Sequence, residues 1–386
     1  MQIVNGRIWP MDGPIIENGY VMVEAGRIAG VGPMTAAPAD DQRVDAGGRL
    51  VLPGLVDAHC HLGLFGDGMG EEGDDGNEDT DPVTPHLRAI DGVNPLDRCF
   101  AEARAGGVTT VLTGPGSANP VAGQMAVLHT QGRWVDRMVV AAPAAMKFAL
   151  GENPKSSGNE RREGPVTRMA TAALIREALS KGQEYLKKKE MSLHDAEQEA
   201  PEFDAKHEAL IPLLKGRIAA HFHAHRADDI ATAVRIAREF DLRAVIVHGT
   251  EGHLVADLLA QEGIPVIVGP IIGDRSKPEL VHQTAANAAR LAAAGVEVAL
   301  CTDHPENPIQ YLPLAAALAA REGLPEEQAL SAITLTAARL AGVEHRVGSL
   351  TPGKDADLVI WEGNPLALGR PWRVMIQGQW AGEAFS

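Results

Sequence analysis

Residues 245–300 contain three short apolar runs: Val245–His248 (VIVH), Pro265–Val268 (PVIV) and Val296–Leu300 (VEVAL). Helix-length segments accompany them, with Ala227–Phe240 before the first run and Lys277–Ala294 before the third. Strands that alternate with helices predict a parallel sheet with helices packed outside it. We therefore expect an α/β protein whose main domain is a closed (β/α)₈ barrel, the TIM-barrel architecture.

The two ends of the chain show a different pattern. Short strands between glycine turns dominate the first 50 residues, as in Gln2–Ile8, and the last 40 residues, as in Asp357–Trp361. We expect these ends, residues 1–52 and 347–386, to form one composite β-sandwich domain. The barrel, residues 53–346, is then inserted between them. Thr167–Lys189 is predicted to be a helix with a charged, solvent-facing second half.

The composition excludes several classes of protein. The net charge of −16 over 386 residues argues against a nucleic-acid partner, because phosphate binding needs clustered positive charge. No apolar run approaches the roughly 18 residues that span a bilayer, and the N-terminus lacks a signal-peptide pattern. Cys60, Cys99 and Cys301 have no paired spacing. We expect a cytoplasmic homo-oligomer with no membrane contact that acts on a small molecule.

Residues Val56–His61 (VDAHCH) place two histidines two positions apart on a predicted strand. Side chains at i and i+2 point to the same face, so His59 and His61 converge while Cys60 points away. Imidazole is a favoured ligand of Zn²⁺ and similar ions. The pair predicts a metal site at this strand, with two incidental polar histidines as the alternative.

The residues around this pair resemble a known family. Pro53–His61 (PGLVDAHCH) resembles the signature opening of the amidohydrolase superfamily, and Gly26–Gly32 and Gly348–Val359 (GSLTPGKDADLV) resemble the two pieces of its small β domain. The likeness spans nearly the whole chain and is greatest to the imidazolonepropionase-like amidohydrolases. It implies a metal-dependent hydrolase with one or two divalent ions per chain, zinc first, with manganese or iron as alternatives.

The resemblance next implies a ligand histidine at the end of the fifth barrel strand. Ile218–Arg226 (IAAHFHAHR) offers three histidines on one strand face. The family pattern aligns best with His223 as the metal ligand. His225 then lies one step nearer the substrate as a catalytic residue, and His221 lies deeper as a structural residue.

The sixth and eighth strands complete the implied set. The sixth strand ends in His248, a metal ligand by resemblance, and the eighth is followed by Asp303, which matches the family's catalytic aspartate and metal ligand. A polar residue at the carboxyl end of a barrel strand is typical of a catalytic role.

Lys147 follows the apolar residues Ala144–Met146 within Ala144–Leu150 (AAMKFAL), and we expect it to close the third or the fourth strand. A lysine is costly to bury unless it is paired or neutral. Many binuclear relatives use such a lysine, carboxylated by CO₂, as an anionic bridge between two metals, and we expect Lys147 to be a ligand of this kind. The alternatives are a carboxylate such as Glu152 in its place, or a mononuclear site.

A long acidic, glycine-rich connection, Gly66–Asn94, follows the first barrel strand. Its acidic part, Glu71–Asp81, is either a solvated flap or a cover of the barrel mouth that favours cationic groups. Arg226 and His253 are candidates for holding a substrate carboxylate.

The predicted reaction is hydrolysis of a C–N bond in an amide, a cyclic amide or a peptide-like molecule, with Asp303 as general base. A mononuclear heterocycle deaminase and a small dipeptidase or N-acyl amino acid hydrolase are rival enzymes. A non-catalytic assembly barrel is disfavoured because every expected type of ligand is present.

Overall fold

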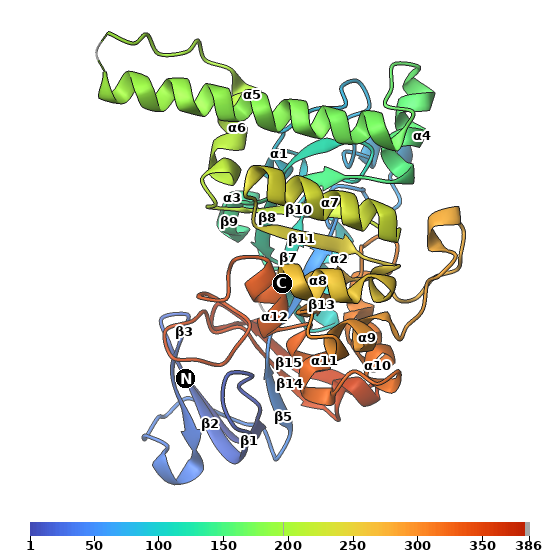
Figure 1. Ribbon diagram of the computed structural model, residues 1–386. Coiled ribbons are helices and arrows are strands. Elements are labelled where there is room, and N and C mark those ends of the chain that lie inside the picture. The colour runs from blue at the N-terminus through green and yellow to red at the C-terminus, as the bar shows by residue number, and fades with distance from the viewer. Residues whose placement is uncertain (196, 383–386) are drawn as a thin grey trace.

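The computed structural model describes residues 1–195 and 197–382, whose strands form two eight-stranded sheets. The last residues of the predicted composite domain, 383–386, lie outside the described part. One sheet forms the barrel in chain order, confirming the expected architecture (Figure 1). Its strands are β6 (Leu55–Cys60), β7 (Val108–Thr113), β8 (Val121–His129), β9 (Val139–Ala149), β10 (Ala219–Ala224), β11 (Ala244–His248), β12 (Val266–Val268) and β13 (Val298–Leu300).

The other sheet combines both ends of the chain, as Figure 1 shows by the blue and red strands lying together. Its order is β16-β15-β14-β5-β1-β2-β3, with β4 paired to β1. Pairing between β5 and β14 joins the two ends, while the division at residues 52 and 347 stays a prediction. The strands are β1 (Gln2–Ile8), β2 (Ile16–Glu24), β3 (Arg27–Pro33), β4 (Arg43–Asp45), β5 (Leu50–Pro53), β14 (Leu358–Glu362), β15 (Arg370–Ile376) and β16 (Gln379–Trp380).

One barrel strand departs from the all-parallel expectation. β8 runs antiparallel to both β7 and β9, and only residues 114–120 separate it from β7. A parallel crossover needs a dozen or more residues, so this short connection can only turn the chain back on itself. As a consequence, the carboxyl end of β8 lies beside the start of β7, where His129 pairs with Thr110.

The segment Ala332–Ile333 and one side-chain hydrogen bond join the first and last barrel strands. The Val56 amide donates to the Ile333 carbonyl at 2.8 Å, and the Leu300 amide donates to the Ala332 carbonyl at 2.9 Å. Further toward the carboxyl ends, the Thr302 hydroxyl donates to Asp57 Oδ2 at 2.5 Å. These contacts close the barrel between β6 and β13.

The expected helix Ala227–Phe240 is confirmed as α7, which buries apolar residues at helical spacing. The helix predicted from Thr167 is α5 (Arg168–His194), with Thr167 as its N-cap. The helix expected over Lys277–Ala294 is wrong in its first half, where only a turn forms, at Pro278–Leu280. In the second half, α9 covers Asn287–Ala293. Pro278 lies in the first turn, where a missing amide hydrogen is tolerated, and the helical turn that it begins ends at Leu280.

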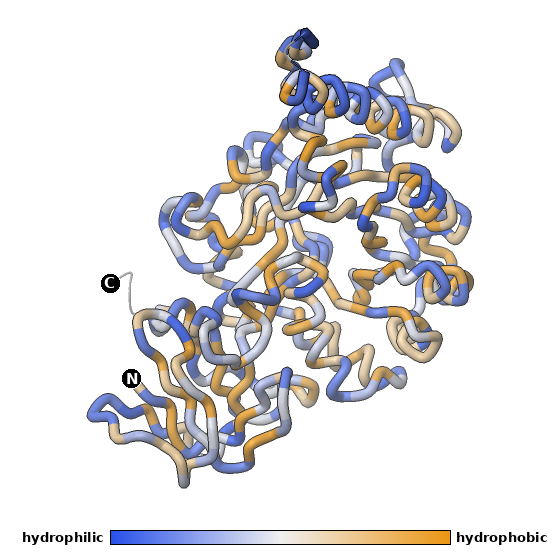
Figure 2. Tube along the Cα trace, turned by 60° about the vertical axis from the view of Figure 1, so that its left-hand side comes forward, coloured by the Kyte–Doolittle hydropathy of each residue, from blue (hydrophilic) through white to orange (hydrophobic). Residues whose placement is uncertain are grey.

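The remaining helices are mostly short and lie outside the barrel, whose strands carry the most apolar segments (Figure 2). None of the helices between residues 1 and 382, position 196 aside, is both long enough and apolar enough to cross a bilayer. They are α1 (Ala89–Gly92), α2 (Arg98–Ala105), α3 (Val135–Met138), α4 (Glu152–Arg161), α6 (Ala205–Leu214), α8 (Ala256–Glu262), α10 (Leu312–Arg321), α11 (Glu326–Ser331) and α12 (Leu335–Leu340).

Candidate metal and active site

The residues predicted as ligands and catalysts come together at the carboxyl ends of the parallel barrel strands. Five of them line a cavity of about 490 Å³, and His59 and Lys147 are buried beside them. Two groups of three side chains at this cavity could each hold an ion. Within each group, the potential ligand atoms all lie within 4.8 Å of one another. The first group is His59, His61 and Asp303, and the second is His223, His225 and His248.

In the first group, two imidazoles from β6 face one carboxylate. His59 Nε2 and His61 Nε2 lie 3.4 and 3.3 Å from Asp303 Oδ1. His61 Nδ1 lies 2.7 Å from the Gly114 carbonyl oxygen, which can only accept, so Nδ1 carries the proton and Nε2 keeps its lone pair. Burial, followed by the charge of Lys147, holds the pKa of His59 well below its usual value. A neutral imidazole is the form that binds a metal.

Asp303 follows β13 and stays ionised in a buried position. Burial by itself raises the pKa of a carboxyl, but His248, His59 and His61 hold that of Asp303 well below its usual value. Asp303 and His248 adopt positive φ angles of 55° and 72°. Such angles are uncommon for residues other than glycine and cluster at functional sites, where the surrounding structure maintains them.

The histidines of the second group differ in how many of their ring nitrogens are engaged. His248 Nδ1 lies 2.7 Å from the Gly269 carbonyl oxygen, so its Nε2 is open. Neither nitrogen of His223 has a hydrogen-bond partner among the described residues. His225 Nδ1 lies 2.7 Å from Thr250 Oγ1, and its Nε2 faces Glu279 Oε1 at 3.7 Å. Among the described residues, His223 therefore keeps two open nitrogens, whereas His248 and His225 each keep only Nε2, which in His225 faces a carboxylate.

Burial also lowers the basicity of this second group. It brings the pKa of His248 to about 4, and it holds the pKa values of His223 and His225 well below the usual range. All three rings are therefore neutral near pH 7.

Lys147 lies at the first group, on β9, which is the fourth barrel strand. Its Nζ is 3.1 Å from His59 Nε2, and its side chain is fully buried. Burial lowers the pKa of its amine to about 8. His221 lies level with Lys147 in the sheet, one step below His223, and does not line the cavity.

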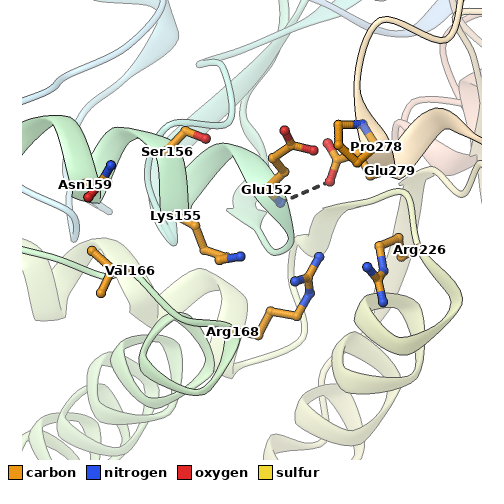
Figure 3. A pocket seen from close by; sticks show the side chains of 9 residues that line it. All are labelled: Glu152, Lys155, Ser156, Asn159, Val166, Arg168, Arg226, Pro278 and Glu279. Carbon is orange, nitrogen blue, oxygen red and sulfur yellow. Dashed lines mark hydrogen bonds between the residues drawn. The ribbon is translucent and has the colours of Figure 1, made fainter.

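The other sequence candidates lie away from the histidines. Glu152 and Arg226 line a separate pocket of about 430 Å³ (Figure 3). There the Arg226 guanidinium forms a two-point ion pair with Asp228 at 2.9 Å. His253 is engaged by Asn287 and does not line the cavity. The structure thus places Lys147 beside the ligand histidines and does not place Glu152 there.

The acidic connection contributes a wall of the cavity through uncharged residues. Asn77 of this connection lines the cavity beside Phe65, which precedes the connection, whereas none of the acids in Glu71–Asp81 does. Asp81 instead pairs with Lys206. This arrangement favours the solvated flap over a charged cover.

Two buried carboxylates support the site and were not predicted. Asp57 accepts hydrogen bonds from the Thr302 hydroxyl and from the Thr302 and His59 amides, and burial raises its pKa to about 7. Glu279 accepts from the Glu152 amide at 3.0 Å, and its other oxygen faces His225. Asp57 belongs to the Val56–His61 segment, but the strand pattern predicts no role for it. No pattern in the sequence predicts that Glu279 lies near the site.

The donor set fits a divalent metal. Neutral imidazoles and a carboxylate are its ordinary ligands, and buried polar atoms without partners call for an explanation. Both nitrogens of His223, Nδ1 of His59 and Oδ1 of Asp303 are buried with no hydrogen-bond partner in the described part of the chain. Ions held at these two groups would satisfy Oδ1 of Asp303 and one nitrogen of His223.

Comparison with known proteins agrees with this chemistry. The model of the amidohydrolase family matches residues 50–383. The amidohydrolase tasK of Hapsidospora irregularis is 32% identical over 93% of this chain, which spans 39% of that relative's length. The imidazolonepropionase of Paracoccus denitrificans is 28% identical over 90% of this chain and 88% of its own, which supports the imidazolonepropionase-like resemblance.

A solved structure extends this agreement to the fold. The crystal structure of an amidohydrolase from Thermotoga maritima superposes with a TM-score of 0.94 at 44% identity. It covers 98% of this chain and 99% of that chain. The barrel and the composite sheet are therefore arranged as in that protein.

Proposed function

Because this chain belongs to the amidohydrolase family and is a hydrolase of carbon–nitrogen bonds, we propose that it cleaves a small amide, cyclic amide or peptide-like substrate with the help of divalent metal. One observation carries the proposal: two groups of buried ligand atoms meet next to Lys147 at a cavity of small-molecule size.

In this proposal, His59, His61 and Asp303 hold one ion, and His223 and His248 hold a second. Zinc is the expected metal because nitrogen ligands dominate both groups. Bound there, the metal would supply Lewis acidity toward the scissile carbonyl and make water more acidic. His225 is left for the substrate, since Thr250 and Glu279 occupy the surroundings of its two nitrogens.

Lys147 is proposed to bridge the two groups as a carbamate. Its ammonium would first lose one proton to solvent, and the neutral Nζ would then form a bond to the carbon of CO₂ and release a second proton. The loss of two protons turns a buried cation into an anion. Support comes from its position 3.1 Å from His59 Nε2 and from its surroundings, in which no described carboxylate oxygen lies within 4.0 Å of Nζ. A buried ammonium without a partner is costly, and a carbamate held by cations is not.

Asp303 is the proposed general base. Its low pKa keeps it ionised, and its Oδ1 has no hydrogen-bond donor of its own. It would accept the proton of the attacking water and pass it to the departing nitrogen, because an amine leaves far more easily than an amide anion.

A mononuclear deaminase is the second candidate, since His59, His61, His223 and Asp303 could hold a single ion without Lys147. Metal analysis after loading with zinc and bicarbonate separates the two. We expect about two ions per chain, a mass increase of one CO₂ at Lys147, and a loss of one ion in Lys147→Met. One ion per chain with unmodified lysine would contradict the binuclear site. Failure to hydrolyse any amide, cyclic amide or dipeptide would contradict the proposed reaction.

A further inference from the structure

The cavity carries one cationic side chain that the proposed reaction does not use. Lys277 lies in the irregular segment after β12, and it is the only lysine or arginine among the described residues that line the cavity. This is notable in a chain with a net charge of −16.

Lys277 is held in place by uncharged neighbours. Its Nζ donates to Asn153 Oδ1 at 3.0 Å, and the Asn153 amide donates to Ser117 Oγ at 2.7 Å. All three residues line the cavity and come from three different connections of the barrel. The ammonium keeps two further hydrogens to donate, and the Ser117 hydroxyl keeps one.

No carboxylate neutralises this ammonium. Asp274 and Glu306 also line the cavity, both exposed, yet no described carboxylate oxygen lies within 4.0 Å of Lys277 Nζ. Lys277 is itself exposed, so its ammonium is accessible from the cavity that it lines. A cation in this position, joined through Asn153 to a serine hydroxyl and without a counter-ion among the described residues, is suited to bind an anionic group of a ligand.

The rest of the wall fits an apolar side chain. Its apolar residues are Phe65, Pro270, Ile272, Leu280 and Pro305. We propose that Lys277, supported by Asn153 and Ser117, binds the carboxylate of the substrate, so that the substrates are N-acyl amino acids or dipeptides with an apolar side chain. This inference rests on the proposed function, because it names the substrate class of the same site.

The test compares matched substrates on the zinc-loaded protein. N-acetyl-leucine, N-acetyl-methionine and Ala-Leu are each assayed beside the corresponding C-terminal carboxamide, which has the same shape and no charge. We expect kcat/KM to favour the carboxylates by on the order of 10- to 100-fold, the strength of a hydrogen bond to a charged group. In Lys277→Met this preference should fall to about onefold through a higher KM for the carboxylates.

Two further variants control the result. Lys277→Arg keeps the charge and should retain most of the preference. Lys155→Met removes a lysine of the separate pocket in Figure 3 and should leave both substrate series unchanged. Equal hydrolysis of carboxylates and carboxamides by the unmodified protein, or an equal loss of both in Lys277→Met, would overturn the carboxylate site alone. If neither series is hydrolysed, the proposed function and this inference both fail.

Discussion

Buried histidines lie at both ends of the barrel, and their surroundings are opposite. At the carboxyl ends of the parallel strands, His223 faces a cavity, and neither of its nitrogens has a hydrogen-bond partner in the described part of the chain. At the other end, His129 of β8 lies between two carboxylates, with Asp355 Oδ2 3.3 Å from Nε2 and Asp357 Oδ2 3.1 Å from Nδ1. Both rings are almost entirely buried.

The two environments set opposite charges. Burial and neighbouring histidines hold the pKa of His223 well below its usual value. Burial also acts to lower the pKa of His129, but Asp357 and Asp355 outweigh it and raise that pKa to about 9. His129 is therefore a structural cation, whereas His223 is a neutral ring with open lone pairs. Burial alone does not distinguish a ligand from a structural histidine; the carboxylates beside the ring nitrogens do.

His129, Asp355 and Asp357, here called the lower cluster, also join two parts of the chain. Asp355 lies in the segment before β14 and pairs with Arg346 at 2.9 Å as well as with His129 of the barrel. Burial by itself would raise the pKa of Asp355, but His129 and Arg346 lower it to about 2. The charges are thus mutually compensated, which is what a buried ion pair requires.

The largest effect should follow from removing the histidine at the cavity whose two ring nitrogens have no hydrogen-bond partner among the described residues. His223→Ala should lose one metal ion and nearly all activity, because a direct ligand is gone. His225→Ala should keep its metal and mainly raise KM. Metal content after dialysis and steady-state kinetics measure both. Metal loss in His225→Ala with retention in His223→Ala would reverse our assignment.

Asp303→Asn should keep the fold and most of the metal while turnover falls by about 10²- to 10⁴-fold, the usual worth of a positioned general base. Asparagine has the same shape but cannot accept the proton. KM should change much less, since the lost function matters in the transition state. Near-normal turnover in a folded, metal-loaded Asp303→Asn protein would exclude the proposed role.

In the lower cluster, His129→Ala should leave metal content and turnover unchanged and reduce the free energy of unfolding by about 3–5 kcal/mol, because two buried carboxylates lose their shared cation. Urea unfolding at pH 7 measures this loss. His207→Ala, which removes a partly exposed histidine, is the matched control. A similar small loss in both variants would show that the cluster is not stabilising.

The smallest effect is a pH dependence. The pKa of His129 is raised in the folded state from its usual 6.5 to about 9. Its contribution to stability is therefore fully present below about pH 6.5 and is lost as the pH rises through 9, a change of about 3 kcal/mol. The difference in unfolding free energy between the unmodified protein and His129→Gln should shrink by this amount. A difference that stays constant from pH 6.5 to 9.5 would contradict a charged His129.

The fold could be predicted from local patterns because each pattern reflects which side chains have to be buried. Apolar runs such as Val245–His248 alternate with helices such as Ala227–Phe240, and only a sheet covered by helices buries both. The antiparallel β8 was not foreseen, because periodicity marks a strand but not its direction. The helix expected from Lys277 does not form in its first half, where the structure has a single turn at Pro278–Leu280, and that irregular segment carries both Lys277 and Glu279.

The amino-acid sequence by itself determined the family, the barrel and the candidate ligands, because His59 and His61 follow the strand period and His248 and Asp303 sit at strand ends. Only the tertiary structure brought Lys147 to 3.1 Å from His59 Nε2. It also placed Thr250 and Glu279 beside the ring nitrogens of His225 and left Arg226 and Glu152 out of the cavity lining. These differences depend on contacts between residues far apart in the chain, and no local pattern encodes which nitrogen is left without a partner.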